Sequence, residues 1–162
     1  MPSKARRFLV LFSAILFLAA LPVFAQVKAP AFSGEDLEGN LHSLLDYEGK
    51  PLVLYFWATW CPACVTEIVA IEKIHEKYKA DDVVFLAVSL DTDKERLRRF
   101  AEKRGLTFPV LFDGKGWQNE IAGIYGVSRT PSFVIITPDG YVYATGHWGD
   151  DLQSRLNHFL TK

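Results

Sequence analysis

The fold is decided by residues 52–64, which read LVLYFWATWCPAC. The first six residues of this stretch form a continuous apolar run after Pro51, as expected of a strand that is buried on both faces. Apolar residues then recur at intervals of three and four, which predicts a helix from about residue 62 to residue 79. A buried strand that leads directly into a helix is typical of an α/β sheet, and both cysteines lie at that junction.

The rest of the chain continues to alternate strands and helices. Further strands are predicted over residues 83–89, 108–112, 132–137 and 141–147, and further helices over residues 92–104, 117–125 and 150–160. The last two strands are joined by Pro138, Asp139 and Gly140, a link too short for a parallel crossover, so they must pair antiparallel. We therefore predict an α/β fold with a mixed central sheet flanked by helices.

Two local signals refine this layout. Thr92 and Glu95 have the spacing of a capping box, which predicts the start of the second helix, and Gly105 marks its end. Residues 31–33 and 41–43 are short extended segments that enclose a stretch rich in turn residues. We expect them to form a small β-hairpin ahead of the main sheet.

Length and composition exclude several classes of protein. The chain has 162 residues, which is room for one domain and a terminal segment. Its 18 Lys and Arg against 19 Asp and Glu give a net charge of −1, so a nucleic-acid partner is not expected. With two cysteines in total, the chain cannot be a secreted scaffold held by several disulfides.

The N-terminal segment has the features of an export signal. Basic residues precede the run 8–21, which is apolar in all but one position, and Val23 and Ala25 supply small residues at the −3 and −1 positions of a cleavage site. We expect a signal peptide over residues 1–25 and a folded domain over residues 26–162. The alternative is an uncleaved anchor, because the apolar stretch is only slightly shorter than the ~20 residues that span a bilayer. Either reading predicts an extracytoplasmic, periplasmic domain.

The cysteine pair at the strand–helix junction predicts redox chemistry. Side chains three residues apart on a first helical turn have Cβ atoms ~5–6 Å apart, so small adjustments bring Cys61 and Cys64 within disulfide range. Cys61 lies where free N–H groups and the helix dipole stabilise a thiolate, which makes it the expected nucleophile. Cys64 lies one turn further in and is expected to resolve a mixed disulfide. Pro62 fits between them, because a first helical turn needs no N–H from it.

Other roles for the two cysteines are weaker. A structural bridge that closes so small a loop stabilises the fold by at most roughly 2 kcal/mol. A structural zinc site needs four ligands, and the chain has no second cysteine pair and no histidines at ligand spacing. Two inert buried thiols are possible, as is a carrier that holds Cu(I) on two thiolates. We favour redox exchange, and a redox-inert interaction domain stays as a third class.

Glu67 is a candidate proton carrier. It follows Cys64 by one helical turn on a stripe that is otherwise apolar and continues to Ile71, Ile74 and Tyr78. A carboxyl group in such a stripe is partly buried, which raises its pKa toward the range in which it can exchange a proton with Cys64. The competing reading is a solvated glutamate at the edge of the stripe.

Several motifs together resemble one family. Residues 56–64 (FWATWCPAC), followed by Glu67, by residues 108–110 (FPV) and by residues 126–131 (GVSRTP), resemble the exported thioredoxin-like reductases of the TlpA/ResA type. The resemblance covers about residues 29–160. It implies the thioredoxin fold with an N-terminal β extension, and thiol-disulfide exchange with exported proteins.

The resemblance also assigns further site residues. It implies a cis bond between Thr130 and Pro131, in a loop that faces the cysteines and receives the backbone of the partner. Without it, Pro131 is explained as the first residue of a strand, which needs no N–H donor. It places an acidic residue at Glu67 in the proton-carrying role. Thioredoxin itself carries a buried aspartate where this chain has Tyr55.

The aromatic residues near the cysteines allow two readings. Trp60 precedes Cys61 and either offers an apolar surface to a partner or packs internally. We include Trp60 and Pro62 with Thr130 and Pro131 among the expected substrate-binding residues. Trp117 and Trp148 are expected to pack at the core or its edge.

The leading hypothesis is an exported thiol-disulfide oxidoreductase that reduces disulfides of extracytoplasmic proteins. We expect a monomer without metal or organic cofactor, and a membrane electron donor that restores the dithiol. Disulfide oxidation or isomerisation remains an alternative direction, since potentials of such pairs span ~−270 to −120 mV. Preparation of apocytochrome c is one possible use, although residues 128–132 lack that branch's signature.

Overall fold

The computed structural model describes residues 27–161. The expected signal peptide over residues 1–25 lies outside the described residues. Within residues 27–161, every helix is too short or too polar to cross a membrane.

The centre of the molecule is a mixed five-stranded sheet with the strand order β5-β4-β3-β6-β7. The strands are β3 (Leu52–Trp57), β4 (Val84–Ser89), β5 (Val110–Leu111), β6 (Ser132–Ile136) and β7 (Val142–Gly146). All six residues of β3 are buried, which confirms the strand expected from the continuous apolar run. β3 pairs parallel with β4 and antiparallel with β6, and β7 pairs antiparallel with β6 as the short turn required.

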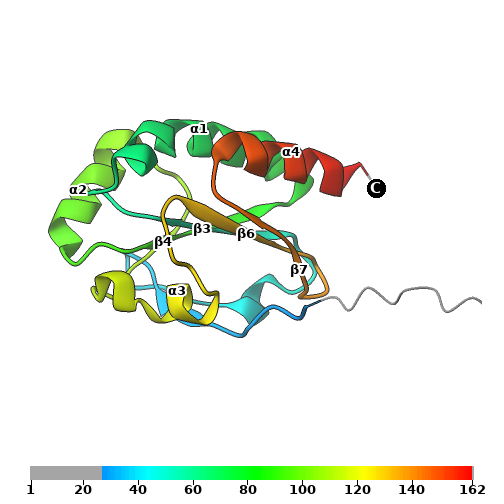
Figure 1. Cartoon of the computed structure of the whole chain (residues 1–162), viewed down its shortest axis with the longest axis horizontal. Coiled ribbons are helices and arrows are strands. Elements are labelled where there is room, and N and C mark those ends of the chain that lie inside the picture. The colour runs from blue at the N-terminus through cyan, green and yellow to red at the C-terminus, as the bar shows by residue number, and fades with distance from the viewer. Residues whose placement is uncertain (1–26, 162) are drawn as a thin grey trace, which may run out of the picture.

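Helices cover both faces of this sheet (Figure 1). The helices are α1 (Pro62–Tyr78), α2 (Lys94–Arg104), α3 (Glu120–Ile124) and α4 (Gly149–Leu160), with short 3-10 turns η2 (Leu44–Tyr47), η3 (Lys79–Asp81) and η4 (Gly116–Gln118). Figure 1 shows α1 and α4 side by side on one face, and α3 with the N-terminal segment on the other. The predicted order of elements and the predicted mixed sheet are therefore confirmed.

Successive side chains of β3 point to opposite faces of the sheet and pack against different helices. The Trp57 ring packs on Phe100 of α2 with centroids 5.6 Å apart, whereas the ring of its neighbour Phe56 packs toward Tyr125, just after α3, at 6.3 Å. Because side chains alternate along a strand, Tyr55 shares the face of Trp57. That face is also the one covered by α1.

Helix α1 is hydrogen-bonded to α4 at two places along its length. Near its start, Glu67 Oε1 accepts a hydrogen bond from the Gly149 N–H at 3.3 Å. At its end, the Tyr78 hydroxyl donates to Asn157 Oδ1 at 2.6 Å. Between these two places the buried stripe of α1 packs on the sheet and includes Ile71.

Two helix starts differ from the sequence expectation. The second helix is capped by Asp93, whose carboxylate accepts the Arg96 N–H at 2.9 Å, so it begins at Lys94 and the expected capping box on Thr92 is wrong. It ends at Gly105 in the left-handed conformation, as expected. The helix expected over residues 117–125 is interrupted by Asn119, whose side chain caps α3. A side chain that caps a helix inside an expected helix divides it, because the cap residue itself is not helical.

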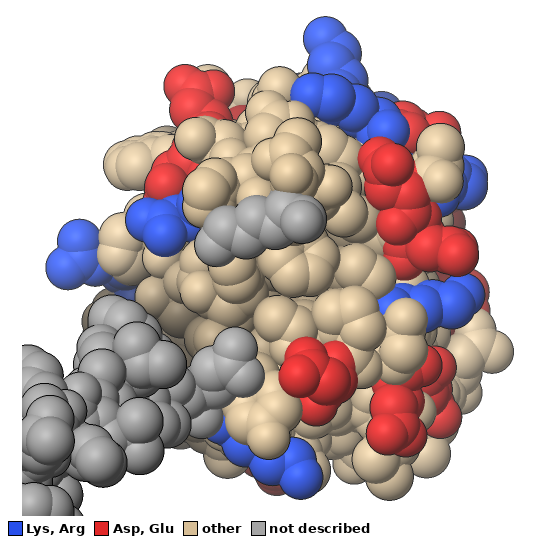
Figure 2. All heavy atoms as spheres, turned by 90° about the vertical axis from the view of Figure 1, so that its right-hand side faces the viewer, with Lys and Arg blue, Asp and Glu red and all other residues tan. Residues whose placement is uncertain are grey.

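The charged residues are well mixed on the face drawn in Figure 2. Basic and acidic side chains surround a largely uncharged centre on that face. No single sign of charge is concentrated on it.

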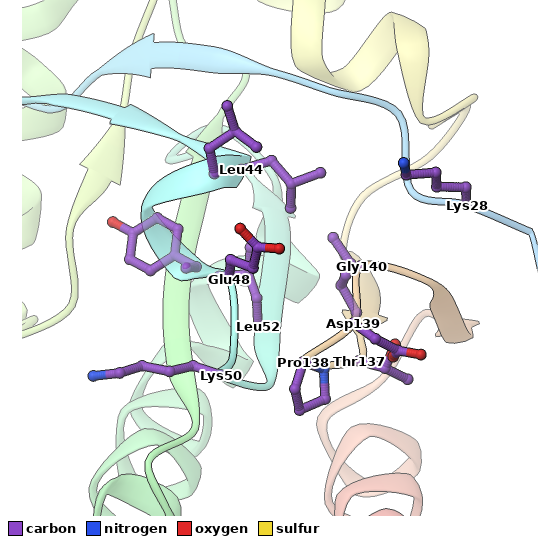
Figure 3. Close-up of a pocket in the computed structure, with 12 residues that line it drawn as sticks. Lys28, Leu44, Glu48, Lys50, Leu52, Thr137, Pro138, Asp139 and Gly140 are labelled. Carbon is purple, nitrogen blue, oxygen red and sulfur yellow. The ribbon is translucent and has the colours of Figure 1, made fainter.

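A cavity of about 130 Å³ lies at the end of β3 that is opposite the cysteines. Figure 3 shows it between η2, with Leu44, and the turn from β6 to β7, with Pro138 and Gly140. Leu52, the first residue of β3, forms part of its wall. This cavity therefore belongs to the far end of the sheet and not to the cysteine site.

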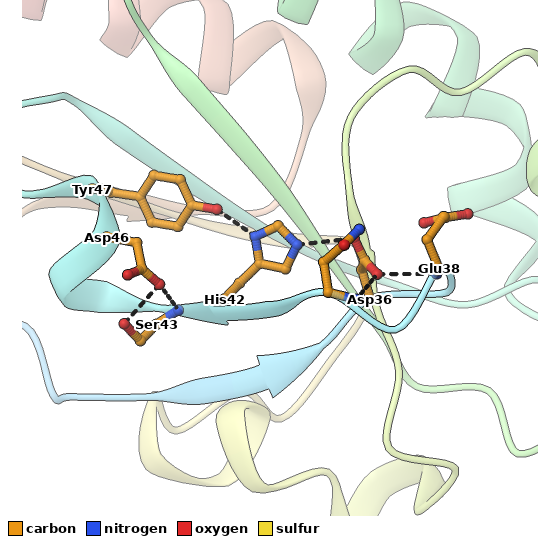
Figure 4. Close-up of polar contacts among 7 residues, drawn as sticks. Asp36, Glu38, His42, Ser43, Asp46 and Tyr47 are labelled. Carbon is orange, nitrogen blue, oxygen red and sulfur yellow. Dashed lines mark hydrogen bonds and ion pairs between the residues drawn. The ribbon is translucent and has the colours of Figure 1, made fainter.

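The expected N-terminal hairpin is present as a separate two-stranded sheet. It pairs β1 (Ser33–Glu35) with β2 (Leu41–Ser43) antiparallel, and β1 begins two residues later than expected. Its turn is closed by Asp36, which accepts hydrogen bonds from the N–H groups of Glu38 and Asn40. Figure 4 shows His42 between Asp36, at 2.9 Å, and the hydroxyl of Tyr47, at 2.5 Å. The hairpin is thus held by its own polar network.

Candidate active site

The two cysteines form a disulfide at the start of α1, as expected. Their Cα atoms are 5.3 Å apart. Cys61 is the N-cap residue of α1, and Pro62 follows in the first helical turn. Cys61 is 5% exposed and Cys64 is fully buried. Cys61 is therefore the sulfur nearer to solvent, although only a small part of it reaches the surface.

The helix start favours negative charge on Cys61. The backbone N–H of Cys64 donates to Cys61 Sγ at 3.2 Å. When the disulfide is open, this N–H and the helix dipole stabilise the thiolate over the thiol, because both present positive charge to the sulfur.

The loop before β6 faces the cysteines. The Thr130–Pro131 peptide bond is cis, as the resemblance implied. Cys61 Sγ lies 3.7 Å from the carbonyl oxygen of Thr130. Since Ser132 pairs with Phe56 in the sheet, the antiparallel pairing of β6 with β3 brings this loop to the end of β3 from which the cysteine segment leaves.

The segment between β3 and Cys61 is anchored by a carboxylate that the sequence analysis missed. Asp91, which is buried, accepts hydrogen bonds from the N–H and the hydroxyl of Thr59, at 2.9 and 2.5 Å. It also accepts from the hydroxyl of Ser89, at 2.8 Å. The available signal was a polar residue immediately after a buried strand. The contact of Asp91 with Thr59 depends on the strand register. Trp57 pairs with Ser89, so the residue two positions after Ser89 comes to lie beside the residue two positions after Trp57.

Two exposed tryptophans flank the cysteine site. Trp60 is 45% exposed and Trp117 is 47% exposed, and their ring centroids are 6.0 Å apart. The Trp60 indole N–H donates to the carbonyl of Leu90 at 3.2 Å, which fixes the ring. The two rings line an open groove of about 410 Å³. Trp117 and Trp148 are both more exposed than the expected packing role requires.

Glu67 is half-buried, as the stripe on α1 predicted. Burial raises the pKa of its carboxyl group, the hydrogen bond from the Gly149 N–H opposes this, and the charge of Asp150 adds to it. Its second oxygen, Oε2, is buried without a hydrogen-bond partner among the described residues. The geometry thus provides a carboxyl group of raised pKa one helical turn beyond Cys64.

Within residues 27–161, one group of side chains has ligand atoms close enough together to hold a metal ion. Atoms of Glu72, His75 and Glu76 lie within 4.8 Å of one another. The Thr107 hydroxyl donates to Glu72 Oε1 at 2.5 Å and lies 3.2 Å from Glu76 Oε1. In the structure these carboxylates therefore connect α1 to the segment that leads into β5.

Comparison with known proteins gives a consistent result. The model of the AhpC/TSA family matches residues 25–145. The chain is 39% identical over 114 residues to the thiol-disulfide oxidoreductase ResA of Geobacillus thermodenitrificans, covering 70% of this chain and 64% of the relative. It is 36% identical over 135 residues to ResA of Bacillus thuringiensis strain Al Hakam, covering 83% of this chain and 76% of the relative. The match thus spans slightly less than two thirds of the Geobacillus protein.

Solved structures agree with the fold. The thioredoxin domain of a thiol-disulfide oxidoreductase from Bacteroides vulgatus superposes with a TM-score of 0.75 at 27% identity, covering 83% of this chain and 96% of that domain. The thioredoxin fold with an N-terminal β extension, expected from the resemblance, is confirmed. The chain belongs to the AhpC/TSA family of thioredoxin-like proteins.

Proposed function

We propose that the protein is an extracytoplasmic thiol-disulfide oxidoreductase that reduces disulfides of exported proteins. The observation that carries this proposal is the Cys61–Cys64 disulfide at the start of α1, beside the Thr130–Pro131 loop. The similarity to relatives named thiol-disulfide oxidoreductase ResA supports the reaction class. The export signal expected over residues 1–25 supports the compartment.

The first half of the cycle uses Cys61. Its thiolate attacks one sulfur of the partner's disulfide, a bond forms between Cys61 and that sulfur, and the other partner sulfur leaves with the electron pair. The backbone of the partner lies against the Thr130–Pro131 loop. The carbonyl oxygen of Thr130 in this loop is 3.7 Å from Cys61 Sγ. Trp60 and Pro62 border the sulfur and contact the partner's side chains.

The second half of the cycle uses Cys64. Its thiol loses a proton to Glu67, and the resulting thiolate attacks Cys61 Sγ. The bond between Cys61 and the partner breaks, the partner leaves as a thiolate that takes a proton from solvent, and the Cys61–Cys64 bond forms. The exchange needs no cofactor, because both electrons pass between sulfur atoms.

Reduction of partners leaves this protein oxidised, so each cycle requires a reductant. We propose a membrane electron donor that passes two electrons to the Cys61–Cys64 disulfide. Domain 26–162 then acts as a monomeric carrier between this donor and exported proteins.

A trapping experiment tests the function. The C64S variant should accumulate covalent complexes with exported proteins through Cys61, because the second half of the cycle is blocked. A thiol reductant should cleave the mixed disulfide and release the partner from these complexes. The complexes should be absent from a C61S/C64S control. Recovery of no adducts from the native host would refute the proposal.

A redox titration tests the direction. Equilibration of the Cys61–Cys64 pair with glutathione buffers gives its reduction potential. A reductant should have a value near the thioredoxin end of the known range, about −270 mV, and an oxidant a value near −120 mV. A result at the oxidising end would replace reduction by disulfide formation.

A further inference from the structure

Among the described residues, four buried side-chain polar atoms lack hydrogen-bond partners, and they include Trp57 Nε1 and His75 Nδ1. The other two lie on β3 and on α1, the helix that covers that face of β3. They are the hydroxyl oxygen of Tyr55 and Oε2 of Glu67. Tyr55 is 1% exposed, in the central strand of the sheet. Burial raises the pKa of Tyr55 above its usual range, and the negative charge of Glu67 raises it further. Tyr55 lies on the face of β3 that α1 covers and Glu67 lies on α1, so the two groups come from facing elements.

The unpaired hydroxyl calls for a role other than packing. A buried donor without a partner destabilises the folded state, and phenylalanine would fill nearly the same volume without that penalty. The structure contains the closed disulfide, in which Cys64 carries no proton and Glu67 has none to accept. The hydroxyl is thus expected to act in the other states of the cycle.

Building on the proposed function, we propose that Tyr55 is a positioning residue whose phenol donates a hydrogen bond to the Glu67 carboxylate and so sets the pH range in which Glu67 accepts the proton of Cys64. The other groups that face Glu67 are the Gly149 N–H and the charge of Asp150, both from α4. The Gly149 N–H stabilises the carboxylate and Asp150 opposes it. When the disulfide is open, Tyr55 supplies a second donor, from the sheet side.

The role of Tyr55 follows from the second half of the cycle. The Cys64 thiol gives its proton to the Glu67 carboxylate, and the sulfur then attacks Cys61 Sγ with release of the partner as a thiolate. The phenol keeps its own proton throughout. Because a hydrogen bond to a carboxylate favours its charged form, Tyr55 keeps Glu67 able to accept a proton at lower pH.

The test measures how the release step depends on pH. The mixed disulfide of Cys61 with glutathione is formed in acid, and glutathione release is followed after rapid pH jumps for the wild type, Y55F, E67Q and Y78F. Tyr78 is the matched control, because it is a buried tyrosine on the same helix as Glu67, and its hydroxyl already donates a hydrogen bond to Asn157. The acid limb of the wild-type profile should move up by about one pH unit in Y55F, stay in place in Y78F and disappear in E67Q. An acid limb that survives E67Q, or one that does not move in folded Y55F, would overturn the proposal.

A second measurement separates this inference from the proposed function. The Glu67 carboxyl group is titrated by carbon-13 NMR in the dithiol forms of the wild type, Y55F and Y78F. Its midpoint should rise by about one pH unit in Y55F alone. An unchanged midpoint in Y55F refutes the role of Tyr55 whether or not the protein exchanges disulfides. A wild type that never releases glutathione refutes the proposed function, while the carboxyl titration still decides the hydrogen bond.

Discussion

Replacing Asp91 by alanine should destabilise the protein by about 3 kcal/mol. The carboxylate accepts three hydrogen bonds, from the N–H and hydroxyl of Thr59 and from the hydroxyl of Ser89. These donors are buried and would lose their acceptor together. At about 1 kcal/mol for each lost bond, their sum gives the expected loss. The T59V variant removes one of the three bonds and should cost about 1 kcal/mol.

Urea unfolding of the disulfide form provides the assay, because the bridge is then the same in every variant. Wild type, D91A and T59V are compared by their midpoints at a common slope. The order of stability should be wild type, then T59V, then D91A. A loss in D91A no greater than that in T59V would refute the reasoning, since it would mean that neither the backbone N–H of Thr59 nor the hydroxyl of Ser89 depends on this carboxylate.

Three further outcomes are expected. Burial alone would raise the pKa of Asp36, but its hydrogen bonds with His42 and Asn40 lower it from 3.8 to about 2. Asp36 thus contributes about 2 kcal/mol to the free energy of unfolding above pH 3.8, and this contribution is lost as the pH falls toward 2. The stability of D36N should not show this loss between pH 3.8 and 2. A D36N variant with the same acid-unfolding profile as the wild type would contradict the prediction. G146A should cost about 1–3 kcal/mol because its Cβ would overlap the Phe133 ring, whereas G123A, with open space at that position, should be neutral or slightly stabilising; equal melting temperatures would count against this. W60A should raise the KM for disulfide-bearing proteins several-fold and leave the reduction of oxidised glutathione unchanged, and an equal effect on both substrates would mean that Trp60 does not contact protein partners.

The parts of the fold that the sequence predicts best are those encoded by local patterns. The continuous apolar run of β3 and the regular stripe of α1 each determine their element within a residue or two. The start of α2 was less certain locally, because Thr92 and Asp93 are both good caps and stand side by side. Only the placement of the Asp93 carboxylate on the Arg96 N–H decides between them.

The same distinction applies to the site. Cys61, Cys64 and Glu67 lie within seven residues of one helix, so their spacing alone predicts that they cooperate. Thr130 comes to Cys61 across 69 residues of sequence, and that contact was expected only from the family resemblance. The pairing of Asp91 with Thr59 depends on the register of two parallel strands, which a single sequence does not encode in any short motif.

The two hydrogen bonds between α1 and α4 limit how far α1 can move when the disulfide is reduced. With Glu67 bound to Gly149 and Tyr78 bound to Asn157, the helix is held against tilting when its disulfide opens, and movement is confined to its first turn and to side chains. The dithiol and disulfide forms should then present nearly the same surface to a protein partner. Departure of the client would be driven by breakage of the covalent link between the two proteins, without a change in the shape of the surface that held it.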